Sequence, residues 1–133
     1  MPDSRIEPEW LDNKFALAIH DRQLAEHGGA SGIRDAGALE SALSRPVNQW
    51  VYGENELVSL GAAFAFGIAR NHPFADGNKR TAWVVARTFL ALNGVRLAFD
   101  KADAIAKVQQ LAAGELSEEE LADWFRQHLA PAA

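Results

Sequence analysis

The sequence predicts a single all-α domain, a compact bundle of about six helices over residues 1–133. Two observations support this prediction. Apolar residues recur at the three- and four-residue spacing of a helix along most of the chain, and capping residues, glycines or prolines separate the stretches. The length corresponds to one domain, and hydrophobic residues make up 48% of the chain, which is enough for one core.

The first helix is predicted over residues 7–27, after a segment, residues 1–6, that has no periodicity and is predicted to be frayed. Glu7-Pro8-Glu9 suits a first turn, because proline is tolerated there and acids favour the positive end of the helix dipole. Gly28-Gly29 is predicted to end the helix, since glycine readily takes a left-handed conformation. The predicted apolar face consists of Trp10, Leu11, Phe15, Ala18, Ile19 and Leu24.

A short second helix is predicted to begin after Asp35, a good N-cap residue, and to end at Pro46, because the residue before a proline is disfavoured in a helix. Residues 47–55 are predicted to be irregular. Because binding loops often carry aromatic side chains, Trp50 and Tyr52 favour a flap beside a site. The apolar residues of the second helix are Leu39, Ala42 and Leu43.

Two central helices are predicted over residues 56–69 and 78–93. The first is apolar nearly all round, which is typical of a buried helix, and is too short to span a bilayer. Its Gly61 and Gly67 each lower helix propensity by about 1 kcal/mol and favour close packing between helices. The second is predicted to turn Trp83, Val84, Phe89 and Leu90 inward and to stop at Gly94.

The remaining elements are predicted mainly from capping signals. After an extended segment over residues 95–99, Asp100 is predicted to cap a fifth helix that runs through Ala113 and stops at Gly114. Ser117-Glu118-Glu119-Glu120 forms a capping box for a sixth helix. The predicted apolar face of that helix consists of Leu121, Trp124, Phe125 and Leu129.

The loop between the two central helices carries the chemistry, because residues 71–80 read Asn-His-Pro-Phe-Ala-Asp-Gly-Asn-Lys-Arg. At a helix start the first backbone N–H groups have no helical partner and the dipole is positive, which favours an anion. Gly77 permits close approach of a ligand, and Lys79 and Arg80 add two cations. These features predict a phosphate cradle.

The same loop holds a candidate base and a candidate metal ligand. The unperturbed pKa of histidine, near 6.5, suits His72 to general-base catalysis. Asp76 can hold Mg²⁺, which commonly uses one or two carboxylates together with substrate phosphates. Together these groups suit transfer of a phosphorus group from a nucleotide. Each of these residues also has a structural interpretation. His72 could be a hydrogen-bonded structural histidine, and Asp76-Gly77-Asn78 a simple turn with Asp76 as an ion-pair partner. Lys79 and Arg80 could belong to a solvent-exposed helix face.

Composition excludes or disfavours several other classes. The net charge of −5 disfavours direct binding to nucleic acid, so an anionic ligand needs a local positive pocket. Neither a membrane span nor a signal peptide is indicated, and the absence of cysteine suits a reducing, cytoplasmic location. His20-Asp21 suggests a metal phosphohydrolase only weakly, since His27 and His128 have no supporting motif, and a structural role for His20 is the better interpretation.

Residues 72–80 resemble the signature of the Fic/Doc family, His-x-Phe-x-Asp/Glu-Gly/Ala-Asn-Gly/Lys-Arg. The resemblance extends over most of the chain, since Ile19-His20-Asp21, the glycines at 28, 29 and 32, Arg34-Asp35 and the last helix are similar to the death-on-curing (Doc) members. It implies the helical Fic/Doc fold and the toxin of a type II toxin–antitoxin pair. The expected partner is a Phd-like antitoxin whose disordered C-terminal segment folds on binding.

The resemblance also implies roles for individual residues. His72 would activate the target hydroxyl, Asp76 would bind Mg²⁺ or position the phosphates, and Arg70 is a further phosphate contact or else a surface ion-pair residue. Most Fic relatives transfer AMP from ATP and carry glycine at the position of Lys79 and arginine at that of Trp83. The Doc toxins carry the lysine and are implied to transfer the γ-phosphate to a threonine of elongation factor Tu, stopping translation. The implied phosphate cradle consists of Gly77, Asn78, Lys79 and Arg80.

Two departures from the Doc members and two alternatives stay open. Gly77 is the Fic choice where Doc itself has alanine, and Val84 replaces a polar asparagine. Transfer of AMP to a protein hydroxyl is one alternative activity, and a binding module without catalysis is the other.

Overall fold

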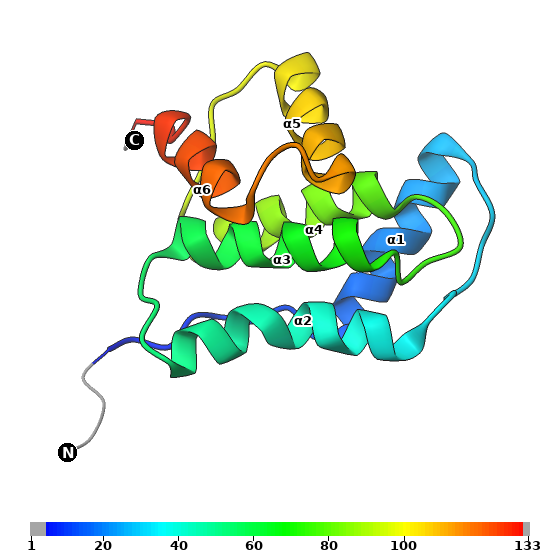
Figure 1. Ribbon diagram of the computed structural model, residues 1–133, viewed down its shortest axis with the longest axis horizontal. Helices are drawn as coiled ribbons and strands as arrows, with labels where there is room; N and C mark the ends of the chain where they lie inside the picture. The colour runs from blue at the N-terminus through cyan, green and yellow to red at the C-terminus, as the bar shows by residue number, and fades with distance from the viewer. Residues whose placement is uncertain (1–4, 132–133) are drawn as a thin grey trace.

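The computed structural model describes residues 5–131, which form an all-α bundle (Figure 1). Residues 1–4, part of the segment predicted to be frayed, lie outside this range. Within it, the six helices are α1 (Asn13–His27), α2 (Ala36–Val51), α3 (Leu57–Asn71), α4 (Asn78–Leu92), α5 (Lys101–Ala113) and α6 (Glu118–Gln127). The predicted fold class is therefore confirmed. None of the described helices is long and apolar enough to cross a membrane.

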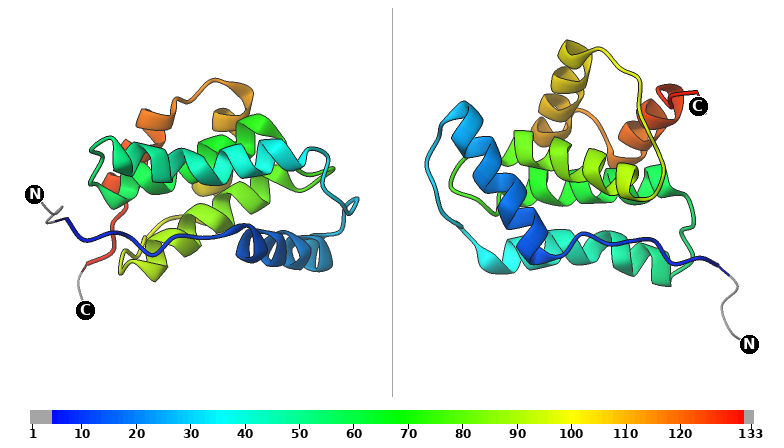
Figure 2. Two further views of the ribbon diagram at one scale, coloured as in Figure 1. Left: turned by 90° about the horizontal axis from the view of Figure 1, so that it is seen from below. Right: turned by 180° about the vertical axis from the view of Figure 1, so that it is seen from behind.

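Helix α3 is the centre of the bundle, as its composition predicts. It packs against α2, α4, α5 and α6, and α1 packs across α4 (Figures 1 and 2). Ten of its 15 residues are buried, because an apolar surface on every side is covered by a neighbouring helix. The motif loop, residues 72–77, leaves its C-terminal end and enters α4, so the site is attached to the most deeply buried element of the fold.

The prediction for the start of the first helix is wrong. Helix α1 begins at Asn13 because Asp12, in extended conformation, accepts a hydrogen bond from the Phe15 N–H (2.9 Å) and acts as the N-cap. The preceding segment crosses the bundle instead, with Leu11 buried and Trp10 stacked on Phe89 at 5.7 Å. Two members of the predicted apolar face, Phe15 and Ala18, are exposed.

The second helix does not end at Pro46. Helix α2 continues to Val51, with Pro46 buried inside it. A proline in a helix interior removes one hydrogen bond and costs about 3 kcal/mol, which the packing of α2 along α3 offsets. Most of the predicted irregular segment is thus helical.

The predicted flap is also wrong, because Trp50 and Tyr52 lie beside the N-terminal end of α3. Helix α3 rises about 1.5 Å per residue over its 15 residues, so the motif loop is about 22 Å away. Trp50 packs edge-on against Trp10 at 6.4 Å, and Tyr52 is 90% exposed. Neither side chain reaches the site.

The C-terminal half follows the capping signals closely. Asp100 accepts the Ala102 N–H, Gly114 is left-handed at the end of α5, and both bonds of the Ser117–Glu120 capping box are present. The extended segment after α4 pairs with the chain after α6, where Leu97 faces Leu129. Leu129 is therefore outside the sixth helix and 48% exposed, contrary to the prediction.

Candidate functional site

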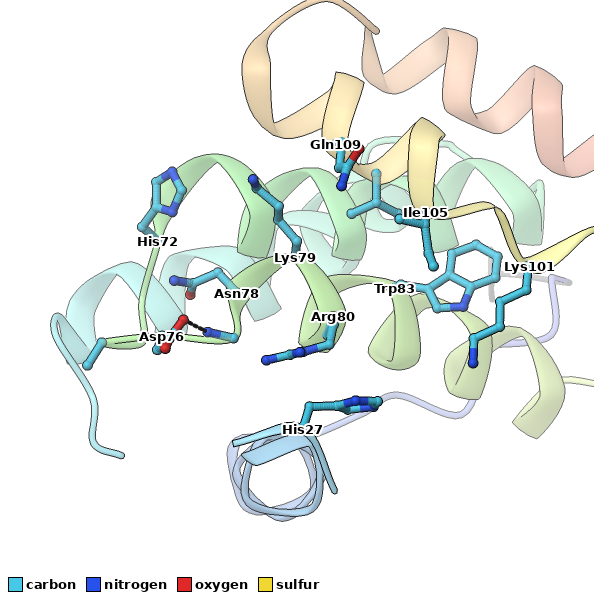
Figure 3. A pocket seen from close by; sticks show the side chains of 13 residues that line it. His27, His72, Asp76, Asn78, Lys79, Arg80, Trp83, Lys101, Ile105 and Gln109 are labelled. Carbon is cyan, nitrogen blue, oxygen red and sulfur yellow. Dashed lines mark hydrogen bonds between the residues drawn. The ribbon is translucent and has the colours of Figure 1, made fainter. Parts of the chain in front are cut away.

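The motif loop begins and ends in left-handed backbone. His72 follows α3 with φ 49° and ψ 58°, and Gly77 precedes α4 with φ 76° and ψ 17°. A left-handed residue at the end of a helix stops it and turns the chain, and glycine adopts this conformation without strain. The two turns bring His72 and the first residues of α4 to one pocket (Figure 3).

Phe74 anchors the loop in the core. Its side chain is 1% exposed and stacks on the buried His20 ring, with centroids 3.7 Å apart. The Asn78 amide holds the Phe74 backbone from the other side: its Oδ1 accepts the Phe74 N–H and its Nδ2 donates to the Phe74 carbonyl, both at 3.0 Å. The Asn78 side chain is thus bound to the loop, and its backbone N–H is the group at the helix start.

His20 has the structural role that the sequence favours. Its Nε2 lies 2.8 Å from the Asp76 carbonyl oxygen, which ties α1 to the loop. Within the described residues, no three His, Cys, Asp or Glu side chains form a group that could hold a metal ion.

A second loop, residues 28–35, lies along the motif loop and fixes its backbone. Ala75 N–H donates to the Gly32 carbonyl (3.1 Å), and the Arg34 N–H donates to the Pro73 carbonyl (2.8 Å). The Arg34 side chain reaches the carbonyls of Asn71 and His72. The sequence shows the glycines of this loop but not that it pairs with a segment some forty residues later in the chain, because the pairing depends on how α1 and α2 pack.

The Asp76 carboxylate is held by two backbone donors. Its Oδ1 accepts the Gly77 N–H (2.8 Å) and its Oδ2 accepts the Ala30 N–H (3.3 Å). These bonds, first from Gly77 and then from Ala30, lower the pKa of Asp76, and the Arg80 charge adds to the effect. The carboxylate is therefore ionised at neutral pH.

The start of α4 is suited to an anion. Among the described residues, no side chain caps this helix, and its first turn contains Lys79 and Arg80. The first backbone N–H groups of the helix, which have no helical partner, and the helix dipole favour a negative group there. Arg80 also donates to the Gly28 carbonyl (3.4 Å), so its guanidinium extends from α4 toward the end of α1.

These groups line a pocket of about 710 Å³, a size typical of small-molecule sites. Figure 3 shows Lys79 projecting between His72 and Gln109, and Arg80 lying above His27. Among the described lining residues, Asp76 is the one carboxylate, against the cations of Lys79, Arg80 and Lys101. The local positive pocket that an acidic protein needs for an anion is present.

Six of the predicted site residues meet at this pocket: His72, Asp76, Gly77, Asn78, Lys79 and Arg80. Arg70 does not line it. The Arg70 guanidinium lies over the Phe66 ring, 5.2 Å from its centroid. Helix α5 supplies a wall that sequence reasoning missed, through Lys101, Ile105, Val108 and Gln109. Their spacing marks one helical face, but nothing in the sequence says that this face meets α4.

The donor set fits Mg²⁺ in one respect. Each Asp76 oxygen accepts a single N–H bond and so retains a lone pair for a cation. One carboxylate with substrate phosphates is a common way to bind this ion, which would neutralise phosphate charge. The exposed His72 imidazole borders the same pocket. An imidazole, two cations at a helix start and an ionised carboxylate therefore lie within one concavity.

Comparison with known proteins is consistent with this geometry. A model of the Fic/DOC family matches residues 10–90. The chain is 49% identical over 95 residues to a protein named Toxin Doc from Mycolicibacterium smegmatis, covering 69% of this chain and 70% of that protein. It is 35% identical over 122 residues to a protein named Protein kinase doc from Escherichia phage P1, covering 91% and 92% of the two chains.

Proposed function

Because the chain belongs to the Fic/DOC family, we propose that it is the toxin of a toxin–antitoxin pair and transfers the γ-phosphate of ATP to a protein hydroxyl. The names of the two relatives, one a toxin and one a protein kinase, support the two parts of this proposal. The antitoxin partner is of the Phd type, and the toxin acts in the cytoplasm.

The chemical step needs a base and a charge clamp. The His72 imidazole takes the proton of the target hydroxyl, whose oxygen attacks the γ-phosphorus. The bond from the γ-phosphorus to the bridging oxygen of the β-phosphate breaks, and ADP leaves with that oxygen. Such a base contributes about 10²–10⁴-fold in rate. Lys79, Arg80 and the N–H groups at the start of α4 stabilise the negative charge on the phosphates.

Mg²⁺, held by Asp76, would neutralise phosphate charge when bound. The motif-loop backbone orients this carboxylate through the Gly77 N–H, and Ala30 supports it from the second loop.

The position of Lys79 is the observation that carries the choice of phosphate over AMP. It points into the pocket beside His72 (Figure 3). An ammonium there occupies space that a phosphate would use if the nucleotide bound in the AMP-transferring direction. Trp83 supports the same choice. It packs edge-on against Phe99 at 5.0 Å, as part of an aromatic wall, where AMP-transferring relatives are implied to have a second phosphate-binding arginine.

The target that the resemblance implies is a threonine of elongation factor Tu, whose modification would stop translation. The direct experiment incubates the chain with purified elongation factor Tu, and separately with cell extract, and ATP labelled at either the γ or the α phosphate. We expect label on protein from γ-labelled ATP alone. Label from α-labelled ATP would replace this proposal with AMP transfer.

His72→Ala separates an enzyme from a binding module. We expect this variant to lose toxicity in cells while its binding to the antitoxin is unchanged, because the imidazole serves the reaction and not the fold. A fully toxic His72→Ala variant would contradict catalysis. RNA cleavage by the purified chain with Mg²⁺ would point instead to a nuclease.

A further inference from the structure

His72 is unusual in its backbone. Among residues 5–131 it is the one residue other than glycine with a positive φ. The left-handed region is disfavoured for a residue with a Cβ atom. Such a residue keeps this conformation only where its surroundings enforce it, and such positions cluster at functional sites. Some other part of the molecule must therefore hold residue 72.

The Arg34 side chain makes that contact. Its Nε donates to the His72 carbonyl at 2.6 Å and its Nη2 donates to the Asn71 carbonyl at 2.8 Å. Carbonyls at the end of a helix have no helical N–H partner, and a cation there complements the negative end of the dipole. Because the guanidinium is planar and rigid, its two donors fix the relative orientation of two consecutive carbonyls.

The backbone at Arg34 is itself fixed, by the motif loop and by the start of α2. Its backbone N–H and that of Asp35 both donate to the Pro73 carbonyl, at 2.8 and 3.0 Å. The Asp35 side chain accepts the Ala38 N–H at 3.0 Å and so caps α2. One dipeptide therefore closes the C-terminal end of α3 and begins α2, which ties the guanidinium to the rigid part of the bundle.

We propose that Arg34 is a positioning residue for the base: by bridging the Asn71 and His72 carbonyls it keeps His72 left-handed and its imidazole at the pocket. This inference rests on the proposed role of His72 as the base. It holds for transfer of the γ-phosphate and for transfer of AMP, since both reactions would use the same base. Without Arg34 the two carbonyls turn to water, and residue 72 relaxes toward the right-handed region and carries its imidazole away from Lys79.

The kinetic test uses the full chain with its protein substrate. We expect Arg34→Ala to lower kcat by about 100-fold, as a misplacement of about 1 Å does, with the KM for ATP little changed. Arg34→Lys, which keeps the charge but has one nitrogen, should fall between this variant and wild type. Added guanidinium should restore part of the kcat of Arg34→Ala. Arg22→Ala, which removes an exposed arginine bonded to Glu26 on α1, is the matched control and should keep full activity.

A second measurement does not depend on activity. The carbon chemical shifts and the amide–α-proton coupling of residue 72 report its φ and ψ. In Arg34→Ala we expect these shifts and this coupling to change toward the values of a right-handed residue. In Arg22→Ala we expect them to equal those of wild type. Unchanged shifts at residue 72, or an unchanged kcat in Arg34→Ala, would overturn the proposal. If wild type transfers no phosphate, the shifts alone decide, so the failure of the proposed function and that of this inference are distinguishable.

Discussion

At the scale of single residues, the Asp76 carboxylate is held in a space shaped by Gly29. A Cβ built on Gly29 would lie 2.8 Å from Asp76 Oδ2 and 3.2 Å from its Cγ. The next residue, Ala30, donates its N–H to the same oxygen. The glycine therefore lets the second loop come close enough to orient the carboxylate.

Gly29→Ala should displace Asp76 and lower kcat/KM for phosphate transfer by about 10-fold or more, because small misplacements in a site are costly. Part of any effect comes from the positive φ of Gly29, 123°. Gly53→Ala controls for that strain, since its φ is 113° and no described atom lies within 4 Å of the added Cβ. Equal activity of the two variants would contradict the role of Gly29. Initial-rate kinetics on both variants provides the measurement.

Lys79→Gly is predicted to weaken γ-phosphate transfer, because it removes a cation from the phosphate cradle. Removal of one such group in other enzymes lowers kcat by about 10²–10³-fold. Lys14→Gly is the matched control, since Asn13-Lys14 begins α1 as Asn78-Lys79 begins α4. Transfer of the γ-phosphate by Lys79→Gly at the wild-type rate would count against the role of this lysine. Label from α-labelled ATP in this variant, but not in wild type, would indicate that Lys79 determines the orientation in which the nucleotide binds.

At the scale of elements, α2 and α3 are in close contact where Gly67 meets Ala42. A Cβ on Gly67 would lie 2.8 Å from the Ala42 Cα and 3.2 Å from its carbonyl oxygen. The helical partner of that carbonyl would be the nitrogen of Pro46, which carries no hydrogen. Gly67 therefore allows the close contact between the helices, and Pro46 leaves the Ala42 carbonyl, which faces Gly67, without a helical N–H donor.

Gly67→Ala should lower the free energy of unfolding by about 1–3 kcal/mol, because the backbone of α2 cannot give way without separating the helices. Gly61→Ala is the matched control on the same helix. The three atoms nearest to its Cβ would all belong to the buried Leu90 side chain, at 3.0–3.3 Å, so a side chain rather than a helix backbone would have to shift. Urea denaturation of both variants provides the measurement. A Gly61→Ala variant as unstable as Gly67→Ala would contradict this account of the packing.

At the scale of the whole molecule, charge is distributed unevenly: the whole chain has a formal net charge of −5, whereas the pocket has cations on its walls. Among the described residues, three carboxyls have a lowered pKa: Glu56 through its bond with Arg126, Asp76 through Gly77, and Glu120 through Ser117. Each stays ionised in the folded chain at a pH where its unfolded counterpart already takes up a proton.

The free energy of unfolding should therefore decrease as the pH falls below about 4, where the unfolded chain binds more protons than the folded one. Urea denaturation between roughly pH 3 and pH 6 measures this dependence. Glu120→Gln should reduce it, because the capping box loses its ionised member. Glu119→Gln, which removes an exposed neighbouring carboxyl and leaves the box, controls for net charge. A stability that is flat over this range would contradict the prediction.

The sequence by itself determined the fold class, the two central helices, the last two helices and six of the residues that line the pocket. Capping and periodicity act within about four residues, so Asp100, Gly114 and Ser117 could be read directly from the chain. The motif brings the residues of the proposed phosphate cradle together by itself, because Gly77 to Arg80 are consecutive at a helix start.

Only the tertiary structure decided which segments meet this motif. Helix α1 begins at Asn13, capped by Asp12, rather than at Glu7, and α2 passes through Pro46. Arg34 reaches His72 across 38 positions, and α5 closes the pocket. Each of these outcomes depends on packing between segments far apart in the chain, which outweighs local preferences of about 1–3 kcal/mol. The residues of the proposed site are therefore local in the sequence, whereas the groups that position them come from distant segments that only folding brings together.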